Sequence, residues 1–382
     1  MTRSERGQGK KRIFHTYYDY SLLFLTLFLV GFGLVMIYST SSFNADREYG
    51  NPAYYLTRQG IFALFGIFVM LVMSTIDYRI FIKKLPIIKV KPVTLLYLLC
   101  LGLQTYVLFF GREIKGSKRW IELGSLGSFQ PSELSKIAVI LFTSYIIHLA
   151  PRRLDKFRGF LRVAFFLSPL ILLVLIPNFS TALVMSAIFV SICFVASRKK
   201  LYFVFTGLAG AALGSLFIFG VDYRGTRIDV WKNVETHPKG YQILQGLYAI
   251  ASGGIFGKGL GQSMQKLGFI PESHNDMIFS VISEELGLFG AISVILLFFL
   301  VIWRLFVIAI NAPDLFGGLI ATGILTHIAV QVLLNVAVVT NTIPSTGIPL
   351  PFISYGGSSL VVLLFEMGIA LSISNQIKYE KV

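Results

Sequence analysis

The chain has 382 residues, of which 55% are hydrophobic and only 14% are charged, and its mean hydropathy is +0.73. A soluble domain of this length would need many more polar residues to cover its surface. The net charge of +15 fits the basic loops of a membrane protein, and we do not attribute it to nucleic-acid binding. Composition therefore excludes an ordinary soluble enzyme and favours a membrane protein.

Apolar stretches of about 18 residues or more recur along the whole chain, a pattern typical of membrane-spanning helices. They are too long and continuous for the strands of a membrane barrel. We therefore predict an all-α polytopic membrane protein with about ten transmembrane helices. The predicted spans lie near residues 19–40, 59–76, 92–111, 131–150, 160–177, 181–197, 201–220, 277–303, 314–340 and 355–376.

Basic residues in the loops predict the topology. They cluster in alternate loops, at residues 79–91, 152–158 and 198–200, and we expect these loops and both chain ends to be cytoplasmic. The two larger loops on the other side, 112–130 and 221–276, also carry basic residues. These are either ordinary solvated loop charges or a site for an anionic ligand, such as a phosphate or a lipid head group.

The predicted organisation is a single transmembrane domain with short ends. A basic cytoplasmic N-terminus at 1–18 precedes the domain at 19–376, and a cytoplasmic tail follows at 377–382. The large outer loop, 221–276, lies between the seventh and eighth helices. The first span is too long for a cleaved signal sequence, so we interpret it as a retained signal-anchor helix.

Polar residues at membrane depth are costly, which makes them candidates for function. Glu133 and Lys136 lie three residues apart, on one face of a predicted helix. They would either pair with each other or face a polar cavity. Just before this helix, Lys118, Arg119 and Trp120 could hold an anion and stack on a sugar. The alternative is an ion pair at the membrane interface, with Trp120 in the aromatic belt.

The segment 253–285 combines glycines with charged residues. Its glycine cluster lacks the spacing of a phosphate-binding Walker loop, and close packing of a flexible loop explains it better. Asp276 is expected near the N-terminus of the next helix, where the helix dipole favours an ionised carboxylate. Helical spacing would then place Asp276, Ser280 and Glu284 on one stripe that runs into the membrane. The alternative is that Asn275 or Asp276 only caps the helix.

Two further breaks interrupt the apolar pattern. Residues 177–182 (PNFSTA) predict a tight turn, with Ser180 or Thr181 as the cap of the following helix. Residues 335–359 contain three prolines and three glycines between two apolar helices. Non-helical backbone at membrane depth is tolerated only where protein buries it or a cavity adjoins it. We therefore expect a re-entrant segment that forms a wall.

These segments, in this order, resemble the SEDS family, the FtsW/RodA/SpoVE group of bacterial cell-wall proteins. The most specific match is TGIPLPFISYGGSSL (346–360), and KRWIELG (118–124), FQPSELSK (129–136) and IPESHNDMIFSVISEELGLFG (270–290) match other family blocks. The first helix and KRWIELG are more similar to the FtsW/SpoVE branch. One departure is at 177–181, where the family more often has an Asp and a Gly.

The resemblance implies a fold of ten transmembrane helices and a peptidoglycan glycosyltransferase activity at the outer face of the bacterial cytoplasmic membrane. The substrate would be lipid II, a disaccharide-pentapeptide carried on undecaprenyl diphosphate. The implied partners are a class B penicillin-binding protein, which supplies the transpeptidase, and other membrane proteins of the divisome or elongasome. A lipid II flippase or transporter, and a non-catalytic scaffold for the transpeptidase, are the alternatives.

The resemblance also implies which residues form the site. The essential outer-loop Asp of the family falls on Asp276, which would act as the base or hold a divalent cation, Mg²⁺ or Mn²⁺. Lys118, Arg119 and Lys136 are candidates for contacts with the diphosphate or the pentapeptide. The remaining expected substrate-binding residues are Trp120, Glu133, Glu272, His274, Ser354, Tyr355, Gly356, Gly357 and Ser358.

Overall fold

The computed structural model describes residues 14–86, 89–114, 117–122, 124, 128–200, 203 and 222–380. Within these ranges nine helices are long and apolar enough to cross a membrane. They are α1 (Tyr20–Tyr49), α2 (Tyr54–Thr75), α3 (Pro92–Phe110), α4 (Pro131–Leu149), α5 (Phe157–Leu175), α6 (Phe179–Ala196), α10 (Ile278–Asn311), α11 (Leu315–Val339) and α12 (Gly357–Asn375). The predicted class, a polytopic helical membrane protein, is confirmed.

Each of these nine helices coincides with a predicted span, and most of their limits agree within a few residues. The predicted span at 201–220 lies outside the described residues, apart from residue 203. The count of ten helices therefore stays a prediction. The largest difference in length is at α1, which continues to Tyr49 because polar residues extend the helix beyond its apolar part.

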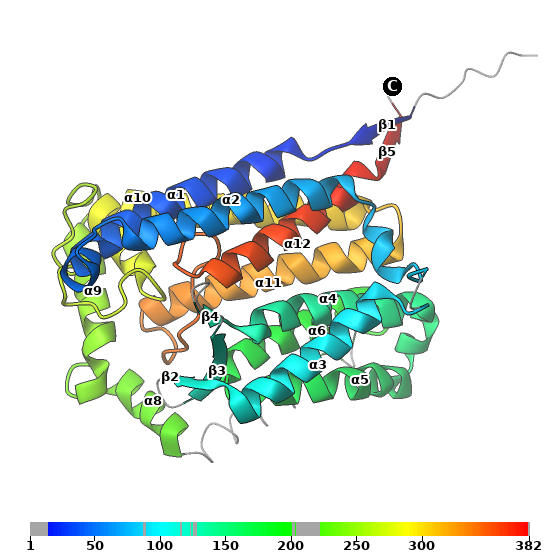
Figure 1. The fold of residues 1–382 in the computed structure, drawn as a ribbon, viewed down its shortest axis with the longest axis horizontal. Helices are drawn as coiled ribbons and strands as arrows, with labels where there is room; N and C mark the ends of the chain where they lie inside the picture. The colour runs from blue at the N-terminus through cyan, green and yellow to red at the C-terminus, as the bar shows by residue number, and fades with distance from the viewer. Residues whose placement is uncertain are drawn as a thin grey trace, which may run out of the picture.

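Both ends of the described chain lie at the same end of the helix bundle (Figure 1). Strand β1 (Phe14–Tyr17) pairs antiparallel with β5 (Ile377–Glu380). Two short 3₁₀ helices, η1 (Tyr78–Ile82) and η3 (Pro151–Asp155), connect α2 to α3 and α4 to α5. We call the opposite end, where α1 finishes and α4 begins, the site end. That the two chain ends share a side fits the predicted topology, while the cytoplasmic assignment of that side stays a prediction.

Three helices form the centre of the bundle. In α4 and α12, 72% of the most apolar stretch is buried inside the protein, and in α11 the figure is 61%, against 28% in α2, α3 and α5. Helices α2 and α12 pack along each other, as do α10 and α11, and α6 and α11. The outer helices leave apolar side chains exposed, as helices that face lipid do.

The site end carries small elements that the apolar pattern did not indicate. Within the predicted loop 112–130, the strands β2 (Arg112–Ile114), β3 (Ser117–Glu122) and β4 (Ser128–Phe129) form an antiparallel sheet in the order β2-β3-β4. Within the predicted loop 221–276 lie α8 (Asp222–Lys232), η4 (Pro238–Gly240) and α9 (Tyr241–Gly253).

Helix α10 is interrupted near its start, at Gly287. This residue has φ 67° and ψ −167°, a conformation that side chains other than glycine rarely adopt. The loop that follows α9 supplies hydrogen-bond partners for the backbone groups that the interruption leaves unpaired. Leu288 N–H donates to the Gly254 carbonyl at 2.9 Å, and Lys258 N–H donates to the Glu284 carbonyl at 3.0 Å. The predicted span 277–303 is therefore two helical segments joined at Gly287.

Candidate active site

A cavity of about 570 Å³ lies at the site end. Residues of α2, the β2-β3-β4 sheet, α4, α6, α8, η4, α9, α11 and the two segments that precede α10 and α12 surround it. Ten of the expected site residues line it: Arg119, Trp120, Glu133, Lys136, Glu272, Asp276, Tyr355, Gly356, Gly357 and Ser358. Segments far apart in the sequence therefore converge on one site.

Glu133 and Lys136 form an ion pair at the wall of this cavity. Their closest atoms, Lys136 Nζ and Glu133 Oε2, are 3.0 Å apart, and the two residues are only 6% and 3% exposed. Ser359 of α12 donates a hydrogen bond to Glu133 at 2.8 Å, and Lys136 also reaches Gln331 of α11 at 3.4 Å. Both predicted arrangements, the pair and the polar cavity, are thus present together. The pair connects the three central helices.

Asp276 faces the cavity from a turn that precedes α10. Helix α10 begins at Ile278, and its N-cap residue, Met277, makes no side-chain capping bond. The prediction that Asn275 or Asp276 caps the helix is therefore wrong, because the chain turns away one residue before the helix starts. The Asp276 carboxylate lies near Gln242 of α9, with 3.5 Å between Gln242 Nε2 and Asp276 Oδ1.

The main chain beside Asp276 is held by three consecutive hydrogen bonds. The carbonyl of His274 accepts from Tyr355 N–H at 2.9 Å, and that of Asn275 accepts from Ser354 Oγ at 2.7 Å. The carbonyl of Asp276 accepts from Asn335 Nδ2 at 2.9 Å. Because each carbonyl has its own donor, the backbone that carries the carboxylate is fixed in place.

His274 and Ser354 were expected to bind substrate, but neither lines the cavity. The His274 ring lies against the rings of Tyr55 and Tyr355, with centroids 4.5 Å and 5.6 Å away. Burial lowers the pKa of His274 to about 4, although the Glu272 carboxylate acts in the opposite direction. The imidazole is therefore neutral at neutral pH and packs as an aromatic ring.

The segment before α12 is non-helical from residue 344 to residue 356 and adjoins the cavity, which confirms the predicted wall. Gln59 of α2 accepts a hydrogen bond from Gly356 N–H at 3.1 Å. Gly347 has φ +67°, and a Cβ added there would lie 3.8 Å from Asp276 Oδ2. A glycine therefore allows the turn that brings this wall beside the carboxylate.

Strand β3 separates two residues that were predicted to act together. Arg119 lines the cavity and donates to the Pro177 carbonyl at 2.6 Å. Lys118 is exposed, donates to the Phe109 carbonyl at 3.2 Å, and is not a lining residue. The pairing of β2 with β3 is irregular here, because Arg112 pairs with Trp120 and Glu113 with Lys118, which leaves Arg119 between two paired residues. An irregularity of this kind redirects a side chain, so Arg119 and Trp120 both line the cavity while Lys118 does not.

The turn at residues 177–182 is present, but its predicted cap is wrong. Asn178 caps α6, and its side chain accepts from Thr181 N–H at 3.2 Å. Ser180 instead donates to the Thr346 carbonyl at 3.0 Å. This turn therefore ties α6 to the wall before α12.

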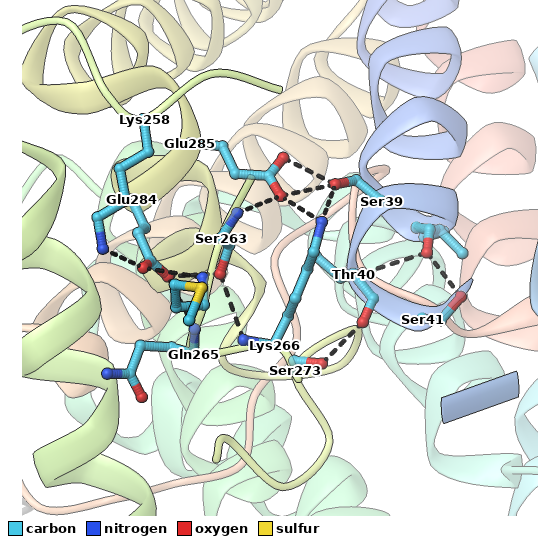
Figure 2. Close-up of polar contacts among 12 residues, drawn as sticks. Ser39, Thr40, Ser41, Lys258, Ser263, Gln265, Lys266, Ser273, Glu284 and Glu285 are labelled. Carbon is cyan, nitrogen blue, oxygen red and sulfur yellow. Dashed lines mark hydrogen bonds and ion pairs between the residues drawn. The ribbon is translucent and has the colours of Figure 1, made fainter. Parts of the chain in front are cut away.

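The predicted stripe of Asp276, Ser280 and Glu284 does not form, because Asp276 precedes the helix. Glu284 lies outside the cavity and accepts from Lys258 Nζ at 2.7 Å and from Ser263. Figure 2 shows Glu284 and Glu285 directed into the loop that follows α9. They hold this loop and do not extend the Asp276 site.

The sequence interpretation missed several residues of the cavity. Of the side chains described by the structure, five cationic ones line it (Arg58, Arg119, Lys136, Arg227 and Lys239), against three acidic ones (Glu133, Glu272 and Asp276). This surplus of positive charge favours anionic ligands. Gln331 and Asn335 could have been noticed as amides within an apolar helix. Nothing in the sequence around Arg58 and Gln242 indicates that they line the cavity.

Comparisons with known proteins identify the family of this chain. The family model described as "Cell cycle protein", FtsW/RodA/SpoVE, matches residues 20–379. The chain belongs to the FtsW/RodA/SpoVE family. It is 38% identical to stage V sporulation protein E of Bacillus subtilis over 94% of this chain and 98% of that protein. It is 39% identical to the "Probable peptidoglycan glycosyltransferase FtsW" of Trichlorobacter lovleyi, over 94% of each chain.

Solved structures of this family share the fold. A chain from the structure described as "Structural coordination of polymerization and crosslinking by a peptidoglycan synthase complex" matches with a TM-score of 0.76 and 28% identity, covering 94% of this chain and 97% of that one. The crystal structure of the Thermus thermophilus rod shape determining protein RodA matches with a TM-score of 0.69 and 26% identity, with the same coverage.

Proposed function

We propose that this protein is a peptidoglycan glycosyltransferase that polymerises lipid II into glycan strands at the outer face of the bacterial cytoplasmic membrane. The observation that carries the proposal is the position of the Asp276 carboxylate in a cavity where cationic side chains outnumber acidic ones. The family supports it, because relatives matched over 94% of this chain are named as probable peptidoglycan glycosyltransferases.

In the proposed reaction a hydroxyl of the acceptor sugar attacks the anomeric carbon of the donor. The new glycosidic bond forms while the bond from that carbon to the diphosphate breaks. Asp276 takes the proton of the attacking hydroxyl, since an ionised carboxylate can accept a proton but not donate one. The cationic residues of the cavity, among them Arg119, Lys136 and Arg227, compensate the charge that develops on the leaving diphosphate.

A divalent cation, Mg²⁺ or Mn²⁺, fits this site only if the protein and the substrate diphosphate bind it together. Among the described residues, no group of three or more His, Cys, Asp or Glu side chains could hold a metal ion. Mg²⁺ is often bound by one or two carboxylates together with substrate phosphates. Asp276, with Glu272 on the same cavity, could supply such carboxylates, and the ion would then help to neutralise the diphosphate.

We also propose a class B penicillin-binding protein as the partner, within the divisome or elongasome. The protein would supply glycan strands, and the partner's transpeptidase would cross-link them. One structural relative comes from a peptidoglycan synthase complex whose description names both polymerisation and crosslinking. In this proposal the site end faces outward, and the chain ends, which lie together at the other end, are cytoplasmic.

Polymerisation of lipid II by the purified protein with its transpeptidase partner tests the proposal. We expect Asp276→Asn to lower the rate by about 100-fold or more, the range of a lost general base. The control is Asp229→Asn, which changes an exposed carboxylate of α8 that does not line the cavity. Both variants should unfold at the temperature of the unchanged protein.

Full polymerisation by a folded Asp276→Asn protein would exclude Asp276 as the base, whereas no polymer formation by the unchanged protein with its partner would support the scaffold. Translocation of lipid II across liposomes, without polymer formation by the unchanged protein, would support the flippase instead.

A further inference from the structure

The loop that follows α9 presents an unusually apolar surface to its surroundings. We call residues 254–269 the apolar loop. Its exposed side chains include Phe256, which is 82% exposed, and Ile255, Leu260 and Met264, which are each more than half exposed. Water-exposed loops of soluble proteins seldom place so many large apolar side chains together. The glycine-rich sequence of this loop is not used by the site around Asp276.

The apolar loop continues a surface that faces lipid. Backbone hydrogen bonds from Leu288 to Gly254 and from Phe289 to Ile255, at 2.9 and 3.1 Å, fix it beside the start of the main part of α10. From there α10 carries a stripe of exposed apolar residues at helical spacing, which includes Phe289, Ile292, Leu296 and Phe299. Such a stripe on the most hydropathic span contacts acyl chains.

Two polar contacts between α1 and α10, an ion pair and a hydrogen bond, mark the depth of this loop. Towards the chain ends, Asp19, which precedes α1, pairs with Arg304 of α10 at 2.8 Å. Towards the site end, Ser39 of α1 contacts Glu285 of α10 at 2.7 Å. Twenty residues of helix separate Asp19 from Ser39, which is about 30 Å at 1.5 Å per residue and equals the thickness of the hydrocarbon core. This spacing fits a position of the apolar loop at the boundary on the site side.

The charges of the apolar loop are turned away from this surface. Its only charged residues are Lys258 and Lys266. Lys258 pairs with Glu284 at 2.7 Å, and Lys266 pairs with Glu285 at 2.8 Å and also donates to Ser39. Figure 2 shows these contacts on the side of the loop that faces the helices. Both lysines are neutralised within the protein, which leaves the opposite surface apolar.

We propose that the apolar loop is inserted into the lipid leaflet at the site end, with Ile255, Phe256 and Leu260 among the acyl chains and head groups. Lipid is the occupant that fits, because the surface is apolar, has no unpaired charge and is continuous with the lipid-facing stripe of α10. The chain runs from this loop directly to Asp276. The loop therefore holds the cavity at the depth of lipid head groups, whether or not the proposed reaction is correct.

Fluorescence in lipid vesicles tests this insertion. Phe256→Cys and Leu260→Cys are made in a Cys100→Ala/Cys193→Ala background, labelled with an environment-sensitive fluorophore, and placed in phosphatidylglycerol–phosphatidylethanolamine vesicles with plain or brominated acyl chains. Labels at Phe299→Cys on the lipid-facing stripe and at Asp229→Cys on α8 give the reference emission and quenching for lipid and for water. We expect blue-shifted emission at 256 and 260, with bromolipid quenching at least twofold stronger than at 229.

Two results would overturn the proposal. Emission and quenching equal to those of the Asp229→Cys control would place the loop in water. Blue-shifted emission without bromolipid quenching would show that protein, such as a second copy of this chain, covers the loop. Because the measurement reads local environment and not turnover, its failure is distinguishable from failure of the proposed glycosyltransferase function.

Discussion

Two buried ion pairs at the site end are closely similar in geometry but differ in their surroundings. Glu133 and Lys136 lie 3.0 Å apart, and Glu285 and Lys266 lie 2.8 Å apart, with all four residues nearly inaccessible. The first pair lines the cavity, whereas the second binds the apolar loop to α10 and α1. Burial and pairing therefore do not by themselves identify a functional site. What distinguishes the first pair is the cavity beside it, with its surplus of cations.

The largest expected effect follows from breaking either pair. Lys136→Met leaves Glu133 as a buried charge without its partner, and Lys266→Met does the same to Glu285. Each should lower the free energy of unfolding by about 3–5 kcal/mol, the usual result of removing one member of a buried pair. Thermal unfolding in detergent measures this, and Lys84→Met, which changes an exposed lysine, is the control. A cost below about 1 kcal/mol would mean that neither pair is desolvated.

Removing both members of a pair should show whether the pair serves stability alone or also activity. Glu285→Gln/Lys266→Met and Glu133→Gln/Lys136→Met each remove the uncompensated charge, so both should regain most of the stability lost in the single variants. The polymerisation rate should recover only in Glu285→Gln/Lys266→Met. We expect the second to stay at least about tenfold slower, because it has lost a cation at the proposed diphosphate site. Equal recovery of activity in both would assign the Glu133–Lys136 pair to stability alone.

A smaller effect concerns His274, whose neutral ring packs beside the cavity. Its pKa is lowered from 6.5 to about 4, so the folded state disfavours the protonated form. The stabilisation is complete above about pH 6.5 and is lost as the pH falls towards 4, by roughly 3 kcal/mol at most. Unfolding measured at pH 7 and pH 4.5 should show a larger loss for the unchanged protein than for His274→Gln. An identical loss would contradict the neutral packing.

The sequence predicted the helices well because long apolar runs leave the chain few alternatives in a membrane. It also predicted the non-helical wall before α12, because prolines and glycines interrupt a helix whatever its neighbours are. The break at Gly287 was missed, since a single glycine within an apolar run is not a sufficient signal. That break depends on a backbone pairing with Gly254 and Lys258, which lie far away in the sequence.

The site was predicted less completely, for a related reason. Glu133 and Lys136 could be paired from their helical spacing, but their contacts with Gln331 and Ser359 come from other helices. Glu284 was assigned to the Asp276 stripe because helical spacing was extended to a residue that lies before the helix. Residue spacing predicts which side chains are neighbours only within one helix or strand. Contacts between different elements can be identified only from the structure.

The smallest expected effects distinguish two adjacent basic residues of β3. Arg119 lines the cavity, whereas Lys118 is exposed and does not line it. Arg119→Ala removes a charge-assisted contact at the proposed diphosphate site, so we expect KM for lipid II to rise about tenfold. Lys118→Ala should change KM less than about twofold, as most exposed charges do. Initial rates against lipid II concentration measure both. Equal changes in KM would mean that both residues act through the overall electrostatic field of the loop. Lining the cavity would then not distinguish a functional charge from a solvated one.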